Sequence, residues 1–363
     1  MKCKTIGVAL ATMGLTLLAA GPAGATSIYN QRGNILICDQ FNNRVIEVDP
    51  VSKNIVWQFG NGSSVAGPHS VVAPNDAQRV GDLTLISGTG APQGSEPGCA
   101  NAPCLDNRVF VVNQAGQIVW QYGKAGLSGS GFDELNTPVQ ATFLPNKHIL
   151  ITDQANNRVI EVTQEHQIVW QYGMTGVAGA DFDQLNTPNS AELLENGDIL
   201  IADENNNRVI EVNRQKQVVW SYNNSGDTSV LNGAAFASRL CNGDTLITDS
   251  NNNRVFEVDS TSSLVGSYYY TSSGAVPNPL PTRAIRLCNG NTLISNQFAG
   301  QVIEVNPSGS IVLSLGKLGV NDNAPGDLNG PYDAKEIGDY VGITPPFGDF
   351  FAVDLLLLGR DGD

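Results

Sequence analysis

The chain has 363 residues and a formal net charge of −15 at pH 7, although only 15% of its residues are charged. An acidic surface repels phosphate groups, so this balance argues against a nucleic-acid partner and against anionic membranes. The length allows one large core or two domains, and the continuous repeat described below favours a single unit.

The N-terminus predicts export. Lys2 and Lys4 precede an apolar run over residues 6–20, and Ala23-Gly24-Ala25 has the small-residue pattern of a cleavage site. This order of features is typical of a secretory signal peptide, which we expect over residues 1–25. A membrane anchor is disfavoured because the run is short and contains Gly and Thr. We therefore expect a secreted or periplasmic protein without a membrane span once the signal is removed.

A ten-residue phrase recurs along the rest of the chain and reads, at its first occurrence, Asp-Gln-Phe-Asn-Asn-Arg-Val-Ile-Glu-Val. Successive copies lie roughly 50 residues apart, a spacing typical of repeat architectures. Four copies match closely and two are degraded; in chain order they lie at 39–48, 107–112, 153–162, 203–212, 249–258 and 296–305.

Three further short segments accompany each copy. An apolar run such as Ile149–Ile151 precedes it, a run ending in an aromatic residue such as Ile168–Tyr172 follows it, and a Pro-x-x-Ala segment such as Pro188–Leu193 lies further upstream. These segments are rich in β-branched and aromatic residues and are bounded by Gly, Asn and Asp, as strands are. The pattern predicts an all-β six-bladed β-propeller of four-stranded blades. In the fifth blade the outer strand is expected at Leu264–Tyr268.

The ends of the chain predict how the ring closes. No Pro-x-x-Ala segment precedes Ile35, but Pro331–Ile337 aligns with Pro188–Leu194. The C-terminus is therefore expected to supply the inner strand of the blade that the N-terminus begins, which leaves no exposed sheet edge. The propeller is predicted over residues 26–345 and a tail over 346–363, too short to span a membrane.

The repeated Asp-x-x-Asn-Asn-Arg-Val-Ile-Glu-Val phrase resembles the NHL-repeat propellers. The flanking Asn-Gly-Asp-Thr-Leu-Ile and Val-Val-Trp-x-Tyr phrases are also similar to the propeller domain of bacterial arylsulfotransferases. The resemblance covers about residues 28–344 and implies the propeller fold. It implies little about activity, because propellers of this kind serve many unrelated functions.

The polar residues of the phrase have two interpretations, a ligand site and a structural role. A residue needed once for chemistry rarely occurs once per blade, and Asp and Asn often bond the local backbone in turns. We therefore expect a structural role for the five repeated arginines and expect the four tryptophans to fill gaps between blades. These residues are Arg44, Arg108, Arg158, Arg208 and Arg254, and Trp57, Trp120, Trp170 and Trp220.

Function is expected where the repeats differ. The phrase turns, the Gly-rich linkers 123–137 and 173–187 and a cysteine-containing insert should share one face, which we call the loop face and expect to bind a protein or small ligand. Alignment on Pro-x-x-Ala places two variable rings on the inner strands, and strand alternation lets either face the axis. The candidate ligand-binding residues are His69, Ser70, Gln140, Asn189, Arg283, Tyr332 and Asp333. The alternative is that they bond one another and plug the channel.

Catalysis has little support in the sequence. A single histidine, His69, is expected on an inner strand, whereas His148 and His166 are expected in turns at the opposite face. No phosphate-binding loop, nucleophile elbow or metal-ligand spacing is present, so we expect no catalytic residue, cofactor or metal. The prediction is an exported, non-catalytic binding propeller. The alternative is a funnel-site enzyme of arylsulfotransferase-like or lactonase-like type.

Cysteine positions predict one disulfide. Cys99 and Cys104 lie close together in the insert, and export makes a bridge between them possible. Cys241 and Cys288 occupy equivalent positions in neighbouring blades, where the spacing disfavours a bridge without excluding it. Cys38 is expected to be a small buried side chain.

Overall fold

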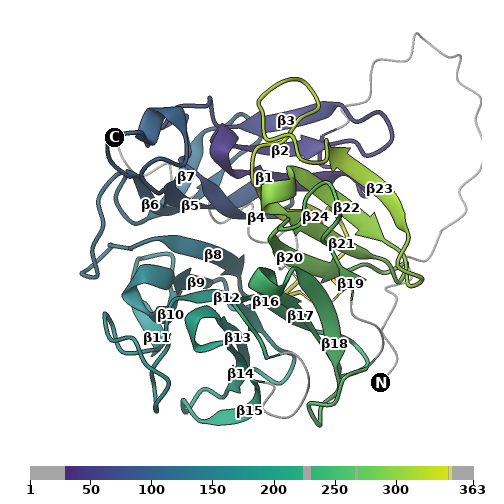
Figure 1. Ribbon diagram of the computed structural model, residues 1–363. Coiled ribbons are helices and arrows are strands. Elements are labelled where there is room, and N and C mark those ends of the chain that lie inside the picture. Colours follow the sequence, from purple (N-terminus) through teal and green to yellow (C-terminus); the bar gives the residue numbers. More distant parts are fainter. Residues whose placement is uncertain (1–28, 224–229, 266–268, 342, 346–363) are drawn as a thin grey trace, which may run out of the picture.

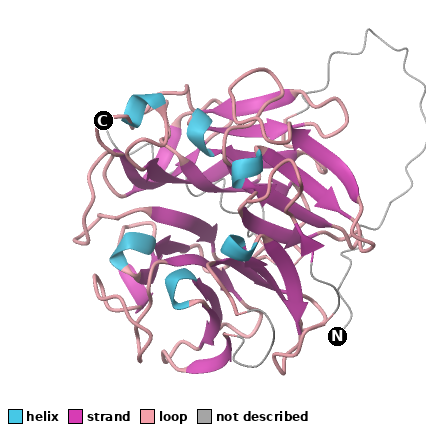
Figure 2. Cartoon of the chain, in the orientation of Figure 1, coloured by secondary structure: helices cyan, strands magenta, loops and turns pink. Residues whose placement is uncertain are grey.

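The computed structural model describes residues 29–223, 230–265, 269–341 and 343–345. Six four-stranded antiparallel sheets form a closed ring. Figure 1 looks along the ring axis, with the inner strands β4, β8, β12, β16, β20 and β24 near the centre. The predicted six-bladed β-propeller is therefore confirmed. Helix in the described residues is limited to short 3-10 turns (Figure 2).

The blades are numbered one to six from the N-terminus, and each has an inner, a second, a third and an outer strand. The inner strands are β24 (Pro331–Glu336), β4 (Pro74–Val80), β8 (Pro138–Phe143), β12 (Pro188–Leu193), β16 (Ala234–Arg239) and β20 (Pro281–Arg286). The second strands are β1 (Ile35–Asp39), β5 (Leu83–Ala91), β9 (Ile149–Asp153), β13 (Ile199–Asp203), β17 (Thr245–Asp249) and β21 (Thr292–Asn296). The third strands are β2 (Arg44–Val48), β6 (Cys104–Val112), β10 (Arg158–Val162), β14 (Arg208–Val212), β18 (Arg254–Val258) and β22 (Gln301–Val305). The outer strands are β3 (Ile55–Phe59), β7 (Ile118–Tyr122), β11 (Ile168–Tyr172), β15 (Val218–Tyr222), β19 (Tyr269–Tyr270) and β23 (Ile311–Gly316).

Blade one is built from both ends of the propeller, as predicted. Its strand order is β24-β1-β2-β3, and β24 pairs antiparallel with β1, with Ile35 opposite Glu336 and Ile37 opposite Ala334. The C-terminal strand thereby covers the hydrogen-bonding edge that β1 would otherwise expose.

The repeated phrase forms the turn between the second and third strands of a blade. In blade three, Asp153 accepts hydrogen bonds from Arg158 Nε (2.7 Å) and from the linker amide of Asn136 (2.8 Å). Asn157 adopts a left-handed conformation (φ 54°), which Asn tolerates better than most residues, and accepts from the Thr187 amide of the next linker (2.9 Å). These contacts support the structural role expected for the phrase, because they fix each linker to the blades it joins.

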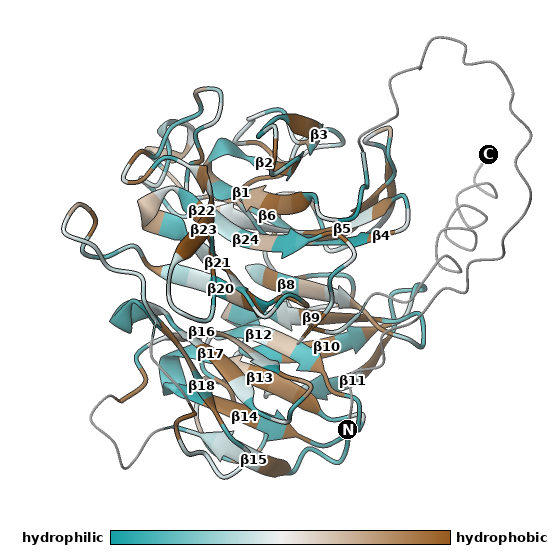
Figure 3. Cartoon of the chain, turned by 90° about the vertical axis from the view of Figure 1, so that its right-hand side faces the viewer, coloured by the Kyte–Doolittle hydropathy of each residue, from teal (hydrophilic) through white to brown (hydrophobic). Residues whose placement is uncertain are grey.

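Side chains also lock neighbouring blades together. The indole N–H groups of Trp57, Trp120 and Trp170 donate to the backbone carbonyls of Gln114, Gln164 and Arg214 in the next blade. The apolar clusters likewise combine residues of adjacent blades, such as Tyr122 of blade two and Phe143 of blade three. Figure 3 shows the apolar segments on strands such as β13 and β14. The tryptophans therefore fill gaps between blades, as predicted.

Blade two corrects part of the prediction. Its inner strand begins at Pro74 rather than at Pro68, so His69 and Ser70 lie in a turn of the preceding linker, closed by the Gly67–Ser70 bridge. The placement of His69 and Ser70 on an inner strand is wrong. The backbone explains the register, because the residue before every inner strand has a positive φ: Ala73, Thr137, Thr187, Gly233, Leu280 and Gly330.

Two predicted segments at the ends of the chain and part of blade five lie outside the described residues. The predicted signal peptide (1–25) and tail (346–363) lie outside the described residues. Of the outer strand predicted at Leu264–Tyr268, Leu264 forms an antiparallel bridge with Val258, and residues 266–268 lie outside the described range. The described strand β19 follows at Tyr269–Tyr270. Among the described residues no helix is long and apolar enough to cross a membrane.

Candidate functional site

Inner-strand side chains bond to one another across the ring axis. Tyr332 on β24 of blade one meets Asn189 on β12 of blade four, and the Asn189 Nδ2 atom lies 2.8 Å from the Tyr332 hydroxyl. Blades one and four lie on opposite sides of the ring (Figure 1). This contact therefore crosses the channel. Burial of the Tyr332 hydroxyl raises its pKa to about 12.

A buried lysine lies beneath this crossing. The Lys335 ammonium group donates to Asp76 Oδ1 (2.6 Å), to Asp333 Oδ2 (2.5 Å) and to the Ala77 carbonyl (3.0 Å). Burial alone would lower the pKa of Lys335, but the two carboxylates raise it above its usual range. The lysine thus supplies the positive charge between two buried acids, where an unpaired carboxylate would be costly.

Asp76 makes the stability of the fold depend on pH. Burial raises its pKa from 3.8 to about 6, against the opposing effect of Lys335. Because the folded-state pKa is the higher one, this group stabilises the fold at low pH and loses that contribution as the pH rises through 6. We expect the free energy of unfolding to be about 1 kcal/mol larger at pH 5 than at pH 7 from this group.

Urea unfolding at pH 5, 6 and 7 measures this effect. Asp76→Asn should flatten the pH dependence, since the amide cannot titrate. Asp82→Asn changes an exposed acid in the same blade and should leave the wild-type dependence intact. An unchanged slope in Asp76→Asn would contradict the assignment.

Arg283 is the least satisfied polar side chain at the axis. It is fully buried, and its Nη1 atom donates to the Ala235 carbonyl (3.2 Å) and weakly to Asn189 Oδ1 (3.4 Å). Within the described part of the chain its Nε and Nη2 atoms have no hydrogen-bond partner, and Nε lies 3.9 Å from Asp333 Oδ1, which also has none. The guanidinium lies over the ring of Phe236 at 4.9 Å, so cation–π attraction offsets part of the missing hydrogen bonding.

The chain that follows β24 covers the end of the channel opposite the loop face. Glu192 accepts from Gln140 Nε2 (2.7 Å) and from the Thr344 amide (2.7 Å), while Gln78 Nε2 donates to the Thr344 carbonyl (3.2 Å). Burial raises the pKa of Glu192, and the hydrogen bonds from Thr344 oppose that shift. The channel is therefore closed by side chains in its middle and by the C-terminal segment at this end.

The loop-face end of the axis carries the polar groups that solvent reaches, and we call it the mouth. Five of the 3-10 turns are formed by copies of the phrase and lie at this face, and their first residues are polar. They are Gln40, Gln154, Glu204, Ser250 and Gln297, the first residues of η1 (Gln40–Asn42), η3 (Gln154–Asn156), η4 (Glu204–Asn206), η5 (Ser250–Asn252) and η6 (Gln297–Ala299). Gln154 and Glu204 are half-buried and the other three are buried.

Five of the seven predicted site residues take part in the axial networks: Gln140, Asn189, Arg283, Tyr332 and Asp333. Asn189 bonds Tyr332 and accepts weakly from Arg283, whereas Gln140 bonds Glu192 and Asp333 bonds Lys335, neither of which was among the predicted residues. His69 is exposed, and Ser70 donates to the Val65 carbonyl. The sequence-based selection missed Asp76, Lys335 and Glu204. The first follows Pro74 by the same spacing that places Asp333 after Pro331, and Glu204 stands where other copies of the phrase have Gln or Ser.

The other histidines also lie away from the axis. His148 is in the turn before β9, with Nδ1 2.6 Å from Glu161 Oε1. His166 is in the turn before β11, 3.1 Å from Asp133 and edge-on to Trp120. Both positions agree with the predicted turns between strands.

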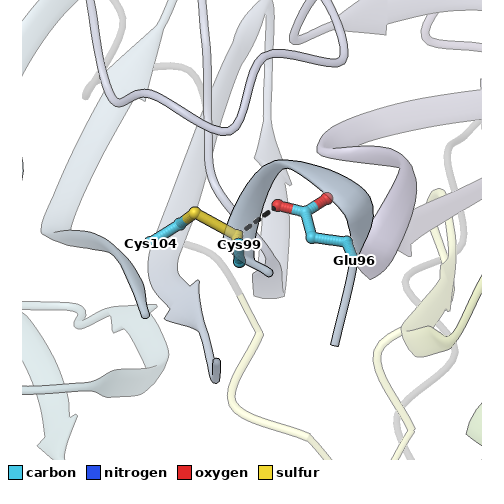
Figure 4. A group of neighbouring side chains, drawn as sticks. All are labelled: Glu96, Cys99 and Cys104. Atoms are coloured by element: carbon cyan, nitrogen blue, oxygen red, sulfur yellow. Dashed lines mark hydrogen bonds between the residues drawn. A yellow bond between two sulfur atoms is a disulfide. The ribbon is translucent and has the colours of Figure 1, made fainter. Parts of the chain in front are cut away.

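The insert of blade two holds the predicted disulfide. Cys99 and Cys104 are bonded, with 5.5 Å between their Cα atoms, and η2 (Pro97–Cys99) carries the first of them (Figure 4). Glu96 lies 2.9 Å from Cys99 Sγ and also accepts from Asn43 Nδ2 (2.7 Å), which ties the insert to blade one. These three residues have metal-ligand spacing, but with both sulfurs in a disulfide only the Glu96 carboxylate remains as a ligand.

The cysteines should separate by reactivity. Cys288 is an exposed free thiol and is therefore not bridged to Cys241, whereas Cys38 is free and buried. Partial burial and the hydrogen bond to Asp339 raise the pKa of Cys288. We expect iodoacetamide to label Cys288 in the folded protein only at alkaline pH, Cys38 only after unfolding, and Cys99 and Cys104 only after reduction. Peptide mapping checks this order, and labelling of Cys99 without reduction would contradict the bridge.

Comparison with solved structures agrees with the fold. A protein of unknown function from Bacteroides caccae matches with a TM-score of 0.57 at 15% identity, over 82% of this chain and 98% of that one. Virginiamycin B lyase from Staphylococcus aureus matches with a TM-score of 0.44 at 14% identity, over 66% and 68% of the two chains. Dihydro-heme d1 dehydrogenase NirN matches with a TM-score of 0.45 at 9% identity, over 89% and 78%. No protein-family model and no curated protein matches the sequence. At 15% identity the likeness to the Bacteroides caccae protein shows a shared fold alone.

Proposed function

We propose that this chain is an exported, non-catalytic propeller of the NHL-repeat kind that binds a protein or small ligand at its loop face. The observation that carries the proposal is the closed axis. Lys335 pairs with both buried aspartates, Thr344 covers Glu192, and Tyr332 bonds Asn189 across the ring. These bonds hold the blades together and occupy the atoms that make them, and the atoms left unpaired, Arg283 Nε and Nη2 and Asp333 Oδ1, are buried from solvent.

The funnel-site enzyme has less support. An arylsulfotransferase-like site would draw on histidines and arginines in the channel, but His69 is exposed in a linker and Arg283 is fully buried. A lactonase-like site would hold a cation between inner acids, and the Lys335 ammonium occupies that position between Asp76 and Asp333.

The loop face offers surface for a partner. Phe132 and Phe182 occupy matching positions in the linkers that precede blades three and four, and they are 68% and 70% exposed. Exposed aromatic side chains of this size are costly in water and favour contact with a binding partner. The disulfide-bonded insert rigidifies the same face, and a rigid surface loses less entropy on binding.

Native mass spectrometry combined with hydrogen exchange tests the proposal. A retained or added ligand that protects linkers 123–137 and 173–187 would support it. Turnover of aryl sulfates, lactones or sugar esters that Arg283→Ala abolishes in a folded protein would overturn it in favour of the enzyme.

A further inference from the structure

Glu204 is distinct among the residues at the mouth. The other four first positions of the phrase turns carry Gln or Ser, so Glu204 is the charged residue of this set. It lies in blade four, directly above Asn189 of the axial network, and its side chain remains half-buried.

The Glu204 carboxylate lacks a cationic partner. Its Oε2 atom accepts from Asn189 Nδ2 (2.8 Å) and from Gln154 Nε2 (3.4 Å), and no lysine, arginine or histidine among the described residues forms an ion pair with it. Burial raises the pKa of Glu204, and the hydrogen bond from Asn189 and the charge of the buried Arg283 offset that shift only in part. A half-buried carboxylate with amide donors alone retains a strong preference for a positive group.

The neighbouring amides add unbonded acceptors to the mouth. Gln154 turns its amino group toward Glu204, and Gln297 turns its amino group toward Gln40 Oε1 (2.5 Å). Among the described residues no partner is present for the Oε1 atoms of Gln154 and Gln297, and neither atom is buried enough to be cut off from solvent. In the described part of the chain the mouth therefore offers unbonded acceptors on Glu204 Oε1, Gln154 Oε1 and Gln297 Oε1.

We propose that the mouth binds a ligand through a primary ammonium group, with Glu204 as its counter-charge and Gln154 as a hydrogen-bond acceptor. An ammonium group brings three donors and one positive charge, which match the unused acceptors and the unpaired carboxylate. A carboxylate or phosphate group would meet Glu204 and a chain of net charge −15. This inference rests on the proposed loop-face binding and names the chemistry of the ligand.

Titration calorimetry on the full mature chain tests the class of ligand. Glucosamine and cadaverine represent an amino sugar and an aliphatic amine, and N-acetylglucosamine is the neutral match of the first. We expect the amines to bind and the acetylated sugar to bind at least tenfold more weakly. Preference for glucosamine over cadaverine would identify a sugar as the source of the ammonium group.

Two variants locate the site. Glu204→Gln keeps the shape and should weaken amine binding about tenfold or more, as expected for a lost charge-assisted hydrogen bond. Glu195→Gln alters an exposed acid in the strand turn at the other end of blade four and should change nothing. Thermal unfolding of both variants confirms that they remain folded.

The outcomes separate this inference from the proposed function. The ammonium assignment would be overturned if no amine bound at concentrations up to about 10 mM, which is high enough to detect weak binding. Equal weakening of amine binding by both variants would overturn it as well. Binding of N-acetylglucosamine that Gln154→Ala removes and Glu204→Gln does not would keep a ligand at the loop face and discard the charge. A ligand that protects neither linker nor mouth would overturn both.

Discussion

A chain that ends at Leu328 is expected to fail to close its ring and to aggregate. This truncation removes β24 and leaves β1 with an unpaired edge in blade one. It also removes Ala334 from the apolar cluster between blades six and one, and it removes Lys335 from beside Asp76. The exposed strand edge favours aggregation, and the uncompensated buried acid lowers the free energy of unfolding. Size-exclusion chromatography and thermal unfolding measure the result.

A chain that ends at Pro345 is the matched control, because it keeps every described residue, including Thr344. It should remain monomeric and cooperative in unfolding. If the shorter chain were also monomeric with an unchanged melting temperature, ring closure by β24 would not be what holds the propeller together.

Lys335→Met is expected to lower the free energy of unfolding at pH 7 by about 3–5 kcal/mol, the cost of removing one partner from a buried ion pair. Both Asp76 and Asp333 lose their cation, while the methionine fills most of the lysine volume. The loss should shrink toward pH 5, because Asp76 then takes up a proton. Urea unfolding at the two pH values measures both effects.

Two comparisons make the lysine result specific. Lys124→Met removes an exposed ion pair with Glu134 and should cost less than about 1 kcal/mol. The triple variant Lys335→Met, Asp76→Asn, Asp333→Asn removes all three charges and should recover a large part of the stability. A Lys335→Met protein as stable as Lys124→Met would show that the buried cluster contributes little.

The fold was predictable because each copy of the phrase favours the same local structure, a turn between two strands. Asn157 tolerates a left-handed turn, Asp153 caps the linker, and the flanking runs alternate as strands. Six such units leave a propeller as the arrangement that pairs all of them. Closure was predictable for the same reason, since Pro331–Ile337 repeats the inner-strand pattern at the far end of the chain.

The composition of the axis was only partly predictable. Two prolines in blade two, Pro68 and Pro74, could each begin the inner strand. The strand begins at Pro74 because Ala73 before it has a positive φ, and an alanine gives no sign of that conformation in the sequence. The inner strands also carry bulges just after their first residue, for example between Pro188 and Ser190. A bulge lets consecutive residues approach the same side, so Asn189 belongs to the axial network although simple alternation would separate it from that face.

Contacts across the ring lie beyond local sequence patterns altogether. Tyr332 and Asn189 come together only when the ring has closed, with two blades between them on each side. Each looks like an ordinary variable position on its own strand. The same holds for Thr344, whose place over Glu192 depends on where the chain runs after its last strand.

The composite first blade has a consequence for how the protein folds. Synthesis delivers β1, β2 and β3 first, yet their fourth strand is the last of the propeller to appear. Three strands must therefore wait, with one edge open, until nearly the whole chain has emerged. Pairing of segments so distant in sequence slows folding and prolongs exposure of aggregation-prone edges. Strong dilution or a chaperone during refolding should raise the yield of this propeller more than that of a ring whose blades are each continuous in sequence.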